Sequence, residues 1–396
     1  MKRTLLLLLL SVSTLWGQFL PDIPDRLSYA AQLNGTSQYF SKATPPKMDL
    51  NGSEVLTVTT TFDANTTGWI GLIASSAVSV NTTSLDRIRS GSGSMRVVMA
   101  SPPSASSGVR VQTAISNSLT SGTTNKFTWE GWFYVPSTDS SKTIIIGATD
   151  QAGATFAENS PTVLVSNTWT KLVVNFQCPG TQSGIMVKAR LAFAGLNDTL
   201  YVDDVSLTQA YDGAVSVEAK TTSGSTQTLA GTSKSNASRL RIWQNTATAS
   251  VTLTDGTTSV TATNSATVND GRFHKWGVTW SKTGNLTLYI DGVAGTGQSI
   301  TGVGAITVDT LWIGRDQAGN YFNGQLGEKI RVRYSSLPSD IAQWIYRATY
   351  ERFIPEPPGG GTTVLRLFGR YNDTYDYSGN QGVLTNTGST PIIQKQ

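Results

Sequence analysis

Residues 286–292 read Leu-Thr-Leu-Tyr-Ile-Asp-Gly, and this stretch decides the class of fold. Apolar and polar side chains alternate along its first five positions, as is typical of a strand with one buried face. The Asp-Gly pair tolerates positive φ and predicts a tight hairpin turn. Residues 55–62 and 171–176 are also rich in strand-forming side chains, and Asn51-Gly52 predicts a second turn. The sequence therefore predicts paired antiparallel strands.

The composition supports the same class of fold. Only 14% of the residues are Asp, Glu, Lys or Arg, and Ser, Thr, Gly and Asn fill much of the remainder, which favours strands and turns over helices. One segment, residues 339–347, has a helical pattern, because Ser339-Asp340 can cap it and its apolar side chains share one face. We therefore expect an all-β protein with one short helix near its C-terminal end.

The N-terminal residues resemble a secretory signal. Residues 1–17 begin with Met-Lys-Arg-Thr, continue with an unbroken run of leucines and end in Trp-Gly. A basic start, a short apolar run and a small residue are typical of a cleaved signal peptide, although an uncleaved apolar anchor has the same pattern. The apolar run is too short for a transmembrane helix, and no later stretch is long enough. The sequence thus predicts a secreted or cell-surface protein without a membrane span.

The net charge argues against a nucleic-acid-binding protein, and the cysteine content excludes a fold held by disulfides within the chain. The formal net charge is +4 for 396 residues, and lysine and arginine do not cluster, so we expect no nucleic-acid partner. Cys178 is the sole cysteine, so no disulfide can form within the chain. The fold must be held by its hydrophobic core, which a chain of this length can build.

Several blocks in the second half of the chain resemble one family of sandwiches. Residues 270–280 read Asp-Gly-Arg-Phe-His-Lys-Trp-Gly-Val-Thr-Trp, and residues 286–292, 311–315 and 321–327 follow in order. Together they resemble the laminin-G-like, concanavalin-type jelly rolls. The chain departs from the pattern at residues 327–330, Gly-Glu-Lys-Ile, where the family often carries Asp-Asp-Val.

The resemblance also implies an interrupted domain. The laminin-G-like family normally opens with a strand such as residues 33–40 and continues with one such as residues 213–220. Here a long insert, residues 53–211, separates the two. The family resemblance therefore implies a discontinuous outer domain made of residues 27–52 and 212–354.

The insert resembles a second jelly roll. The blocks that carry this resemblance are residues 61–69, 91–97, 127–132, 168–171 and 200–207. They are similar to a jelly-roll carbohydrate-binding module, whose most recognisable strand is the last block, Leu-Tyr-Val-Asp-Asp-Val-Ser-Leu. We therefore expect two antiparallel β-sandwiches, one nested in the other, and a polysaccharide or other glycan as the implied partner.

The C-terminal segment is too short to bury a core of its own. Residues 355–361 form a Pro/Gly linker, and residues 362–396 follow it. Within them, residues 374–385 resemble the first strands of a laminin-G-like domain. The tail is therefore predicted to complete the outer domain, either of its own chain or of a neighbouring copy, since a donated strand satisfies an open sheet edge.

Three residues of the insert form the candidate ligand site. Strand alternation places Glu130, Trp132 and Tyr134 on one face and the other aromatic side chains of residues 127–133 on the opposite face. Aromatic faces beside a carboxylate suit a sugar, because the rings stack on the apolar side of a pyranose. The same pattern also fits burial of Trp132 inside the sandwich.

A structural calcium ion is a further expectation for the insert. Asp63 lies in its first strand and Asp203 and Asp204 in its last, and these ends are neighbours in the resembled family. Carboxylate and carbonyl oxygens are the ligands that Ca²⁺ prefers. A solvated acidic pair at a strand end would give the same sequence pattern.

The sequence gives little support for an enzyme. His274 is the sole histidine, which leaves a histidine-based metal site or triad without partners. No strand carries the two closely spaced carboxylates that a glycosidase of this fold needs. We therefore expect a non-catalytic surface protein that binds carbohydrate. The alternative is a structural subunit of an extracellular filament, surface layer or virion, assembled through its C-terminal strands.

Overall fold

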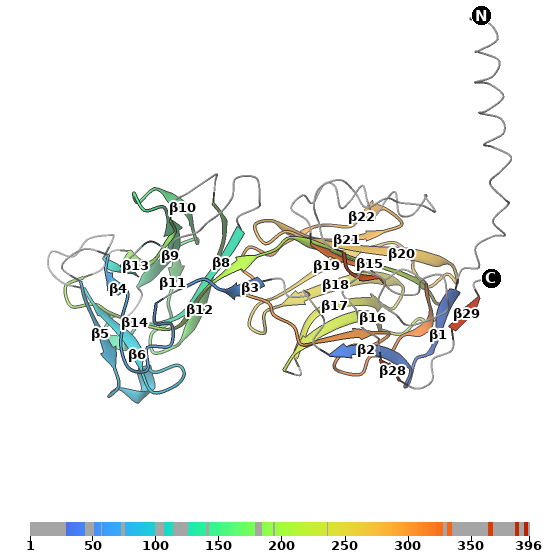
Figure 1. The fold of residues 1–396 in the computed structure, drawn as a ribbon, viewed down its shortest axis with the longest axis horizontal. Helices are drawn as coiled ribbons and strands as arrows, with labels where there is room; N and C mark the ends of the chain where they lie inside the picture. Colours follow the sequence, from blue (N-terminus) through green and yellow to red (C-terminus); the bar gives the residue numbers. More distant parts are fainter. Residues whose placement is uncertain are drawn as a thin grey trace, which may run out of the picture.

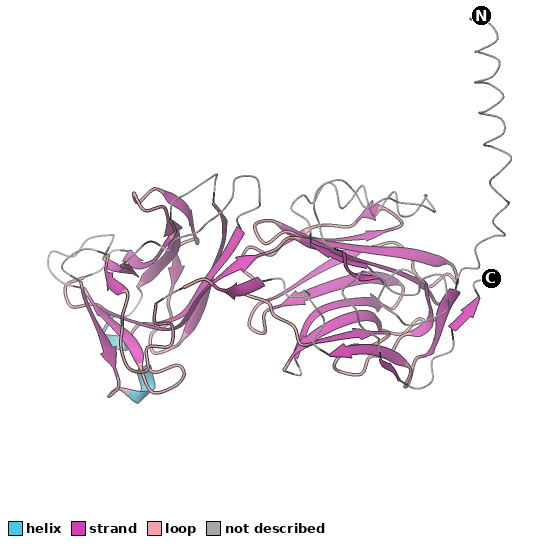
Figure 2. Cartoon of the chain, in the orientation of Figure 1, coloured by secondary structure: helices cyan, strands magenta, loops and turns pink. Residues whose placement is uncertain are grey.

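The structure is a computed structural model that describes residues 29–43, 51–56, 58–72, 76–99, 107–112, 114, 126–139, 142–178, 184–192, 195–235, 237–327, 331–334, 363–366, 385–387 and 392–394. Strands make up almost all of its regular structure (Figure 2), apart from two short 3-10 turns, η1 (Leu85–Arg87) and η2 (Ser137–Asp139). The predicted all-β class is confirmed. The predicted signal segment, residues 1–17, the helix at 339–347 and the linker at 355–361 lie outside the described residues. Within these, no helix has the length and apolar character to cross a membrane.

The inner sandwich consists of two antiparallel sheets. The first, called the β8 sheet, has the order β12 (Thr170–Gln177), β8 (Lys126–Tyr134), β14 (Thr199–Ala210), β6 (Ser94–Val98) and β5 (Ala77–Asn81), with β3 (Asn51–Glu54) also paired to β14. The second, called the β9 sheet, has the order β10 (Thr155–Glu158), β9 (Thr143–Thr149), β13 (Met186–Ala192), β7 (Gly108–Val111) and β4 (Trp69–Gly71), with β11 (Thr162–Val163) paired to β9.

The outer sandwich also has two antiparallel sheets. The β15 sheet has the order β22 (Val293–Ala294), β21 (Asn285–Ile290), β20 (Phe273–Trp280), β15 (Gly213–Lys220), β25 (Asn323–Gly327), β1 (Tyr29–Asn34) and β29 (Ile392–Gln394); β23 (Gln298–Ser299) pairs with β21, β26 (Arg331–Tyr334) with β15, and β27 (Thr363–Arg366) with β26. The β16 sheet has the order β19 (Ser259–Asn264), β18 (Thr248–Thr254), β17 (Ala237–Asn245), β16 (Gln227–Lys234), β24 (Thr310–Ile313), β2 (Tyr39–Ala43) and β28 (Thr385–Thr387).

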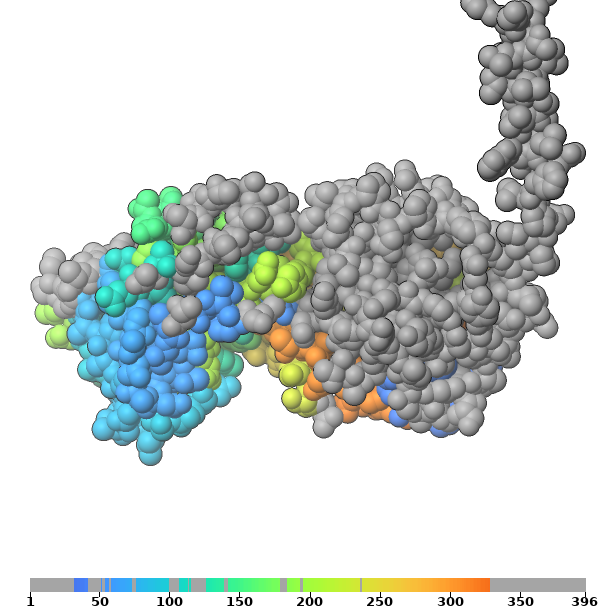
Figure 3. Space-filling view, viewed as in Figure 1, coloured from blue at the N-terminus to red at the C-terminus, as the bar shows by residue number. Residues whose placement is uncertain are grey.

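The chain passes between the sandwiches at one junction. It leaves the outer sandwich after β2, enters the inner sandwich at β3, and returns where β14 gives way to β15. Because β3 pairs with β14, with Asn51 opposite Ala210, the two crossings lie side by side. Figure 1 shows the two sandwiches next to each other along the long axis, and Figure 3 shows the molecule narrowing between them. One sandwich is thus nested in the other.

Strand alternation builds the inner core. On β8, Phe127, Trp129 and Phe133 are buried between the two sheets, where Trp129 stacks on Trp69 with 6.2 Å between ring centroids. β12 contributes its own alternating apolar side chains to the same cluster, as its sequence pattern predicts. Each further aromatic ring that is buried here contributes roughly 1.5–3 kcal/mol to folding.

The outer core follows from the hairpin at residues 286–292. The apolar positions of β21 are buried against Trp276 and Trp280 of β20. Asp291 and Gly292 link β21 to β22 with φ angles of +49° and +84°, values that Gly and Asp tolerate best. The predicted hairpin turn is therefore confirmed.

Two local predictions near the junction are wrong. Asn51-Gly52 does not form a turn, because residues 51–54 make up β3, and Asn51 is buried against distant parts of the chain. Residues 55–62 were predicted as a strand, but the described ones belong to no strand, and Phe62 has a φ of +56°. The strand-forming composition is overridden there by the need to turn the chain into the inner sandwich.

The described tail strands pair with the same chain at the edges of both outer sheets. β29 pairs with β1, β28 with β2, and β27 with β26. In Figure 1, β28 and β29 lie beside these first strands of the chain. The first and last described strands of the protein are therefore hydrogen-bonded neighbours.

Candidate functional site

The predicted ligand residues lie on β8, on the side of its sheet that faces away from the inner core. Glu130, Trp132 and Tyr134 alternate with residues that point into that core. Glu130 and Trp132 are half-buried, whereas Tyr134 is only 3% exposed. The three share one sheet face, but the structure divides them between two different environments.

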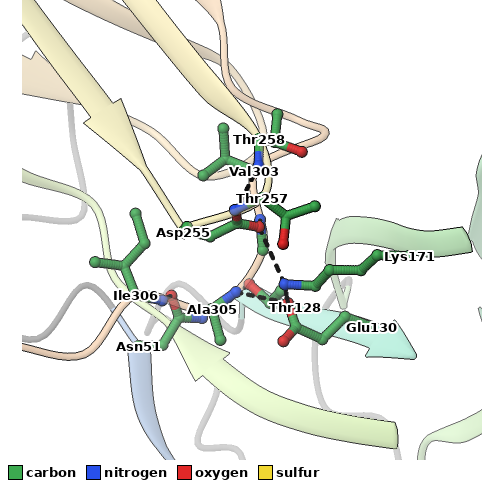
Figure 4. Close-up of polar contacts among 12 residues, drawn as sticks. Asn51, Thr128, Glu130, Lys171, Asp255, Thr257, Thr258, Val303, Ala305 and Ile306 are labelled. Atoms are coloured by element: carbon green, nitrogen blue, oxygen red, sulfur yellow. Dashed lines mark hydrogen bonds and ion pairs between the residues drawn. The ribbon is translucent and has the colours of Figure 1, made fainter. Parts of the chain in front are cut away.

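Glu130 lies at the interface between the two sandwiches. Its Oε2 accepts a hydrogen bond from the Ala305 amide at 2.7 Å and lies 3.3 Å from Nζ of Lys171. Lys171 also pairs with Asp255 of the outer sandwich at 3.1 Å. Figure 4 shows these side chains converging from both sandwiches. Glu130 is therefore engaged in joining the two sandwiches.

The side chain of Asp255 is fully buried at this interface. Its Oδ1 accepts hydrogen bonds from the amides of Thr257 and Thr258, and its Oδ2 from the amide of Gly304. Burial raises the pKa of Asp255, but these amides and the Lys171 ammonium outweigh it and hold the pKa below its ordinary value. The carboxylate is therefore ionised and fixed at neutral pH.

Residues 301–306 of the outer sandwich are held by several inner side chains. Asn51 accepts from the Ile306 amide through Oδ1 at 2.9 Å, and Asn175 donates to the carbonyl of Thr301 at 2.7 Å. From the outer side, the buried Lys282 donates to the carbonyls of Val303 and Gly304. Burial lowers the pKa of Lys282 to about 7. The segment therefore ties the sandwiches together through backbone groups and buried polar side chains.

A group of four aromatic residues, here called the aromatic face, covers the other end of the same sheet surface. It consists of Trp132, Tyr134, Trp169 and Tyr201. The ring centroids of Tyr134 lie 5.5 Å from Trp169 and 5.9 Å from Tyr201. Both tyrosines are buried and both tryptophans are half-buried. Burial raises the pKa of Tyr134, whose hydroxyl donates to Asn167 at 3.0 Å.

Residues 85–92, here called the covering loop, lie over this face. Arg87 donates to the hydroxyl of Tyr201 at 2.8 Å, and the guanidinium carbon of Arg89 lies 4.3 Å from the ring centroid of Trp132. The loop is anchored by Asp203, whose Oδ2 accepts from the amides of Arg89 and Ser90 at 3.0 and 3.2 Å. Burial outweighs these bonds and raises the pKa of Asp203 to about 6. The loop thus places two arginines against the aromatic rings.

The three predicted calcium ligands also serve this loop. Asp63 accepts from the Ser92 amide, and Asp204 accepts from the hydroxyl of Ser90. Asp203 is fully buried under the amides named above. Among the described residues, no three acidic, histidine or cysteine side chains gather as a metal-ligand set. Calcium binding stays a prediction, which thermal unfolding in calcium and in chelator would test.

The outer sandwich has a comparable cluster on the surface of its β16 sheet. The guanidinium carbon of Arg315 lies 4.7 Å from the ring centroids of Tyr39 and Trp312 and 5.1 Å from that of Tyr321. Arg315 donates to the carbonyls of Asp316 and Gln317 at 2.7 and 3.2 Å and to the Tyr321 hydroxyl at 3.3 Å. Its donors therefore hold the chain's own loop.

His274 bridges two turns of the outer sandwich. Its Nδ1 lies 2.7 Å from Asp291, and its Nε2 lies 2.9 Å from Asp270. Burial lowers the pKa of His274, but the two carboxylates outweigh it and raise the pKa above its ordinary value. Since both ring nitrogens are bonded to carboxylates, the residue has a structural role in the hairpin.

Sequence reasoning missed Arg87, Arg89 and Trp169 as members of the site. The pattern Arg-Ile-Arg ahead of a Gly/Ser-rich run could have marked an exposed basic loop. Its position over Trp132 depends on contacts such as Arg87 with Tyr201, which are 114 residues apart. No local pattern reports a contact of that separation.

A known protein family matches part of the second half of the chain. Residues 193–336 match the family described as the concanavalin A-like lectin/glucanases superfamily. This range includes β15 to β26 of the outer sandwich and β14 of the inner one. No curated protein matches the chain by sequence.

Solved structures that resemble the chain include carbohydrate-binding modules. The xylan-binding CBM22-1 domain of Paenibacillus barcinonensis Xyn10C has 14% identity and a TM-score of 0.33, covering 40% of this chain and 96% of that one. TmCBM61 in complex with β-1,4-galactotriose has 12% identity and a TM-score of 0.30, covering 40% and 99%. The CBM22-1–GH10 modules of Clostridium thermocellum Xyn10B, complexed with xylohexaose, have 18% identity and a TM-score of 0.32; the match covers 40% of this chain and 28% of theirs.

Proposed function

We propose that the protein is an exported, non-catalytic glycan-binding protein that binds sugar through the aromatic face of its inner sandwich. One observation carries the proposal: the half-buried Trp132 and Trp169 lie on the outer side of the β8 sheet, where Trp169 contacts the buried ring of Tyr134. Partly exposed aromatic rings on a rigid sheet suit the apolar face of a pyranose, which buries area without requiring a deep pocket.

The indole N–H group of Trp169 is a second feature of this face. It is buried and has no hydrogen-bond acceptor among the described residues. A buried donor without a partner costs free energy, and such donors commonly mark the place of a water or ligand.

The family match offers separate support for the outer sandwich. Its printed description covers lectins and glucanases, so the fold alone does not separate binding from hydrolysis. Glycoside hydrolysis needs two carboxylates on either side of the scissile bond. Glu130 and Asp255 are near each other, but both contact Lys171, and an added Cβ on Gly304 would lie within 2.5 Å of both carboxylates. This closed arrangement supports binding without catalysis.

The cellular location is also part of the proposal. The signal-like residues 1–17 and the carbohydrate-binding role together favour a secreted or cell-surface protein. Adhesion to a polysaccharide is the simplest use of such a surface outside the cell.

The experiment is a binding titration on immobilised polysaccharides, comparing wild type with Trp132→Ala and Trp169→Ala. We expect each variant to weaken binding about tenfold or more, because stacked aromatic rings dominate such interfaces. The matched control is Trp243→Ala. Trp243 is also half-buried and stacks with an arginine, Arg241, on the outer sandwich. Equal losses in all three variants, or no binding by the wild type to any polysaccharide, would contradict the proposal.

A second candidate role, a building block of an extracellular assembly, has one specific observation in its favour. The tail strands β28 and β29 pair along the edges of β2 and β1. A neighbouring copy could supply the same strands by exchange. Light scattering decides between the two arrangements. Large assemblies that become folded monomers on deletion of residues 362–396 support exchange, whereas a full-length monomer that unfolds on deletion supports completion within one chain.

A further inference from the structure

Three arginines surround the aromatic face. Arg87 and Arg89 come from the covering loop, and Arg96 comes from β6. On β6, Arg96 lies opposite Tyr201 and between the core residues Met95 and Val97, so it shares the outer sheet surface with Tyr201. Arg89 and Arg96 are both exposed.

The guanidinium groups of two of these arginines have free donors. Among the described residues, neither Arg89 nor Arg96 has a carboxylate within ion-pair distance. Arg87 gives one donor to Tyr201, and its Nε is buried without a hydrogen-bond acceptor in the described part of the chain. The nearest acid is Asp86 at 3.6 Å, with a side chain 69% exposed, so water weakens this pair.

Other acids nearby do not neutralise the arginines at the surface. Asp203 is fully buried and bonded to backbone amides, and Asp204 accepts from Ser90. Both carboxylates are thus occupied in holding the covering loop, whereas the side chains of Arg89 and Arg96 are exposed to solvent. A ligand that approaches the aromatic rings from solvent therefore meets cationic donors first.

The arginine of the outer cluster differs in this respect. Arg315 donates hydrogen bonds to two backbone carbonyls and to the hydroxyl of Tyr321. Its neighbour Arg241 pairs with the buried Asp316 at 2.7 Å. The two clusters use the same side-chain types, but only the inner one leaves guanidinium donors directed to solvent among the residues described.

Resting on the proposed function, we infer that the glycan bound by the aromatic face is anionic, with a carboxylate or sulfate group on the ring that stacks on Trp132. Guanidinium groups bind such anions through paired, charge-assisted N–H donors. The Asp203 anchor fixes the backbone of Arg89 before binding, so little ordering is required when the ligand arrives.

The test compares charged and neutral forms of one polymer. Binding is titrated on polygalacturonate and its fully methyl-esterified form, and on dextran sulfate and unmodified dextran. We expect at least one anionic form to bind about tenfold more tightly than its neutral counterpart. The carboxylate pair and the sulfate pair show which anion is preferred.

Two variants locate the preference on the protein. Arg89→Gln and Arg96→Gln should each remove most of the advantage of the anionic form. Arg272→Gln, which removes the same charge from a side chain 84% exposed on the outer sandwich, should leave it unchanged. Thermal unfolding of each variant confirms that it is folded.

Three results would overturn the inference. Equal affinity for charged and neutral forms that still depends on Trp132 would leave glycan binding intact and refute the anionic ligand. An equal effect of Arg272→Gln would attribute the preference to net charge alone. Absence of binding to every polymer, neutral xylan and galactan included, would reject the inference together with the proposed function.

Discussion

Each sandwich carries arginine and aromatic side chains packed together on one outer sheet surface. In the outer sandwich, Arg315 is surrounded by three rings and donates to the loop that follows it. In the inner sandwich, Arg89 lies over Trp132, but Asp203 binds its backbone and leaves the guanidinium group unpaired among the described residues. The comparison teaches that the use of the hydrogen-bond donors, more than the ring contact, separates a structural cluster from the surface that we propose for binding.

Gly304 lies at the interface between the two sandwiches, so a substitution there tests whether the two sandwiches unfold together. A Cβ at Gly304 would lie 2.1 Å from Glu130 and 2.5 Å from Asp255. Gly304→Ala should therefore disrupt the buried ion cluster and destabilise the protein by about 3 kcal/mol. Calorimetry should show two unfolding transitions instead of one.

The control for this change is Gly302→Ala, because a Cβ there meets no atom within 4 Å. That variant should unfold as the wild type does. If Gly304→Ala also unfolds in a single unshifted transition, the interface does not couple the sandwiches.

The next largest effect should come from Arg315→Ala. It removes three ring contacts and the hydrogen bonds that Arg315 donates to the carbonyls of Asp316 and Gln317; the Asp316 carbonyl keeps its bond from the Gly319 amide. We expect a loss of about 2 kcal/mol in the free energy of unfolding, measured by chemical denaturation. Glycan binding at a temperature where the variant is folded should not change. Loss of binding with unchanged stability would reverse the roles that we assign to the two clusters.

The anchor of the covering loop should show a characteristic pH dependence. Asp203 has its pKa raised from 3.8 to about 6 by burial, against the pull of three amides. Because the folded protein holds this proton more tightly than the unfolded chain, the stability due to Asp203 is fully present below pH 3.8. It is lost as the pH rises through 6.

Asp203→Asn removes this titration and also one acceptor for the loop amides. The variant should be less stable than the wild type at low pH. The difference between their free energies of unfolding should narrow by about 2 kcal/mol as the pH rises from 4 to 7. Urea denaturation at several pH values measures it. A constant gap over that range would show that Asp203 is solvated in the folded protein.

The smallest effect should come from Arg89→Ala. Its guanidinium group contacts Trp132 but holds no part of the loop, so we expect less than about 1 kcal/mol of destabilisation. Denaturation of this variant beside Arg315→Ala sharpens the comparison directly. Equal losses in the two variants would mean that both arginines are structural.

The residues of the site show how far sequence reasoning reaches. Alternation along β8 correctly separates Trp129, in the core, from Trp132, on the outer surface. It cannot report what covers that surface. Tyr134 is buried because Tyr201 and Trp169 flank it, and Glu130 is bound by Lys171 and by an amide of the other sandwich.

The difference between local preferences and long-range contacts also explains which turns of the fold the sequence predicts. The hairpin at Asp291-Gly292 is encoded by its own dihedral preferences, so its sequence predicts it. Asn51 also belongs to a common turn pair, but its side chain bonds to Thr128 and Thr208, far along the chain. These long-range bonds override the local preference and keep Asn51 in a strand.

The pairing of β1 with β29 has a consequence for the order of events during synthesis. Ala30 lies opposite Ile393, so this contact joins the two ends of the described chain. The inner sandwich holds only strands β3 to β14, and all its pairing partners emerge from the ribosome long before the last strand of the outer sandwich. Contacts of such separation form slowly, because a long loop must close first. The outer sandwich therefore closes only after β29 has been synthesised, whereas the inner sandwich can pair all its strands earlier.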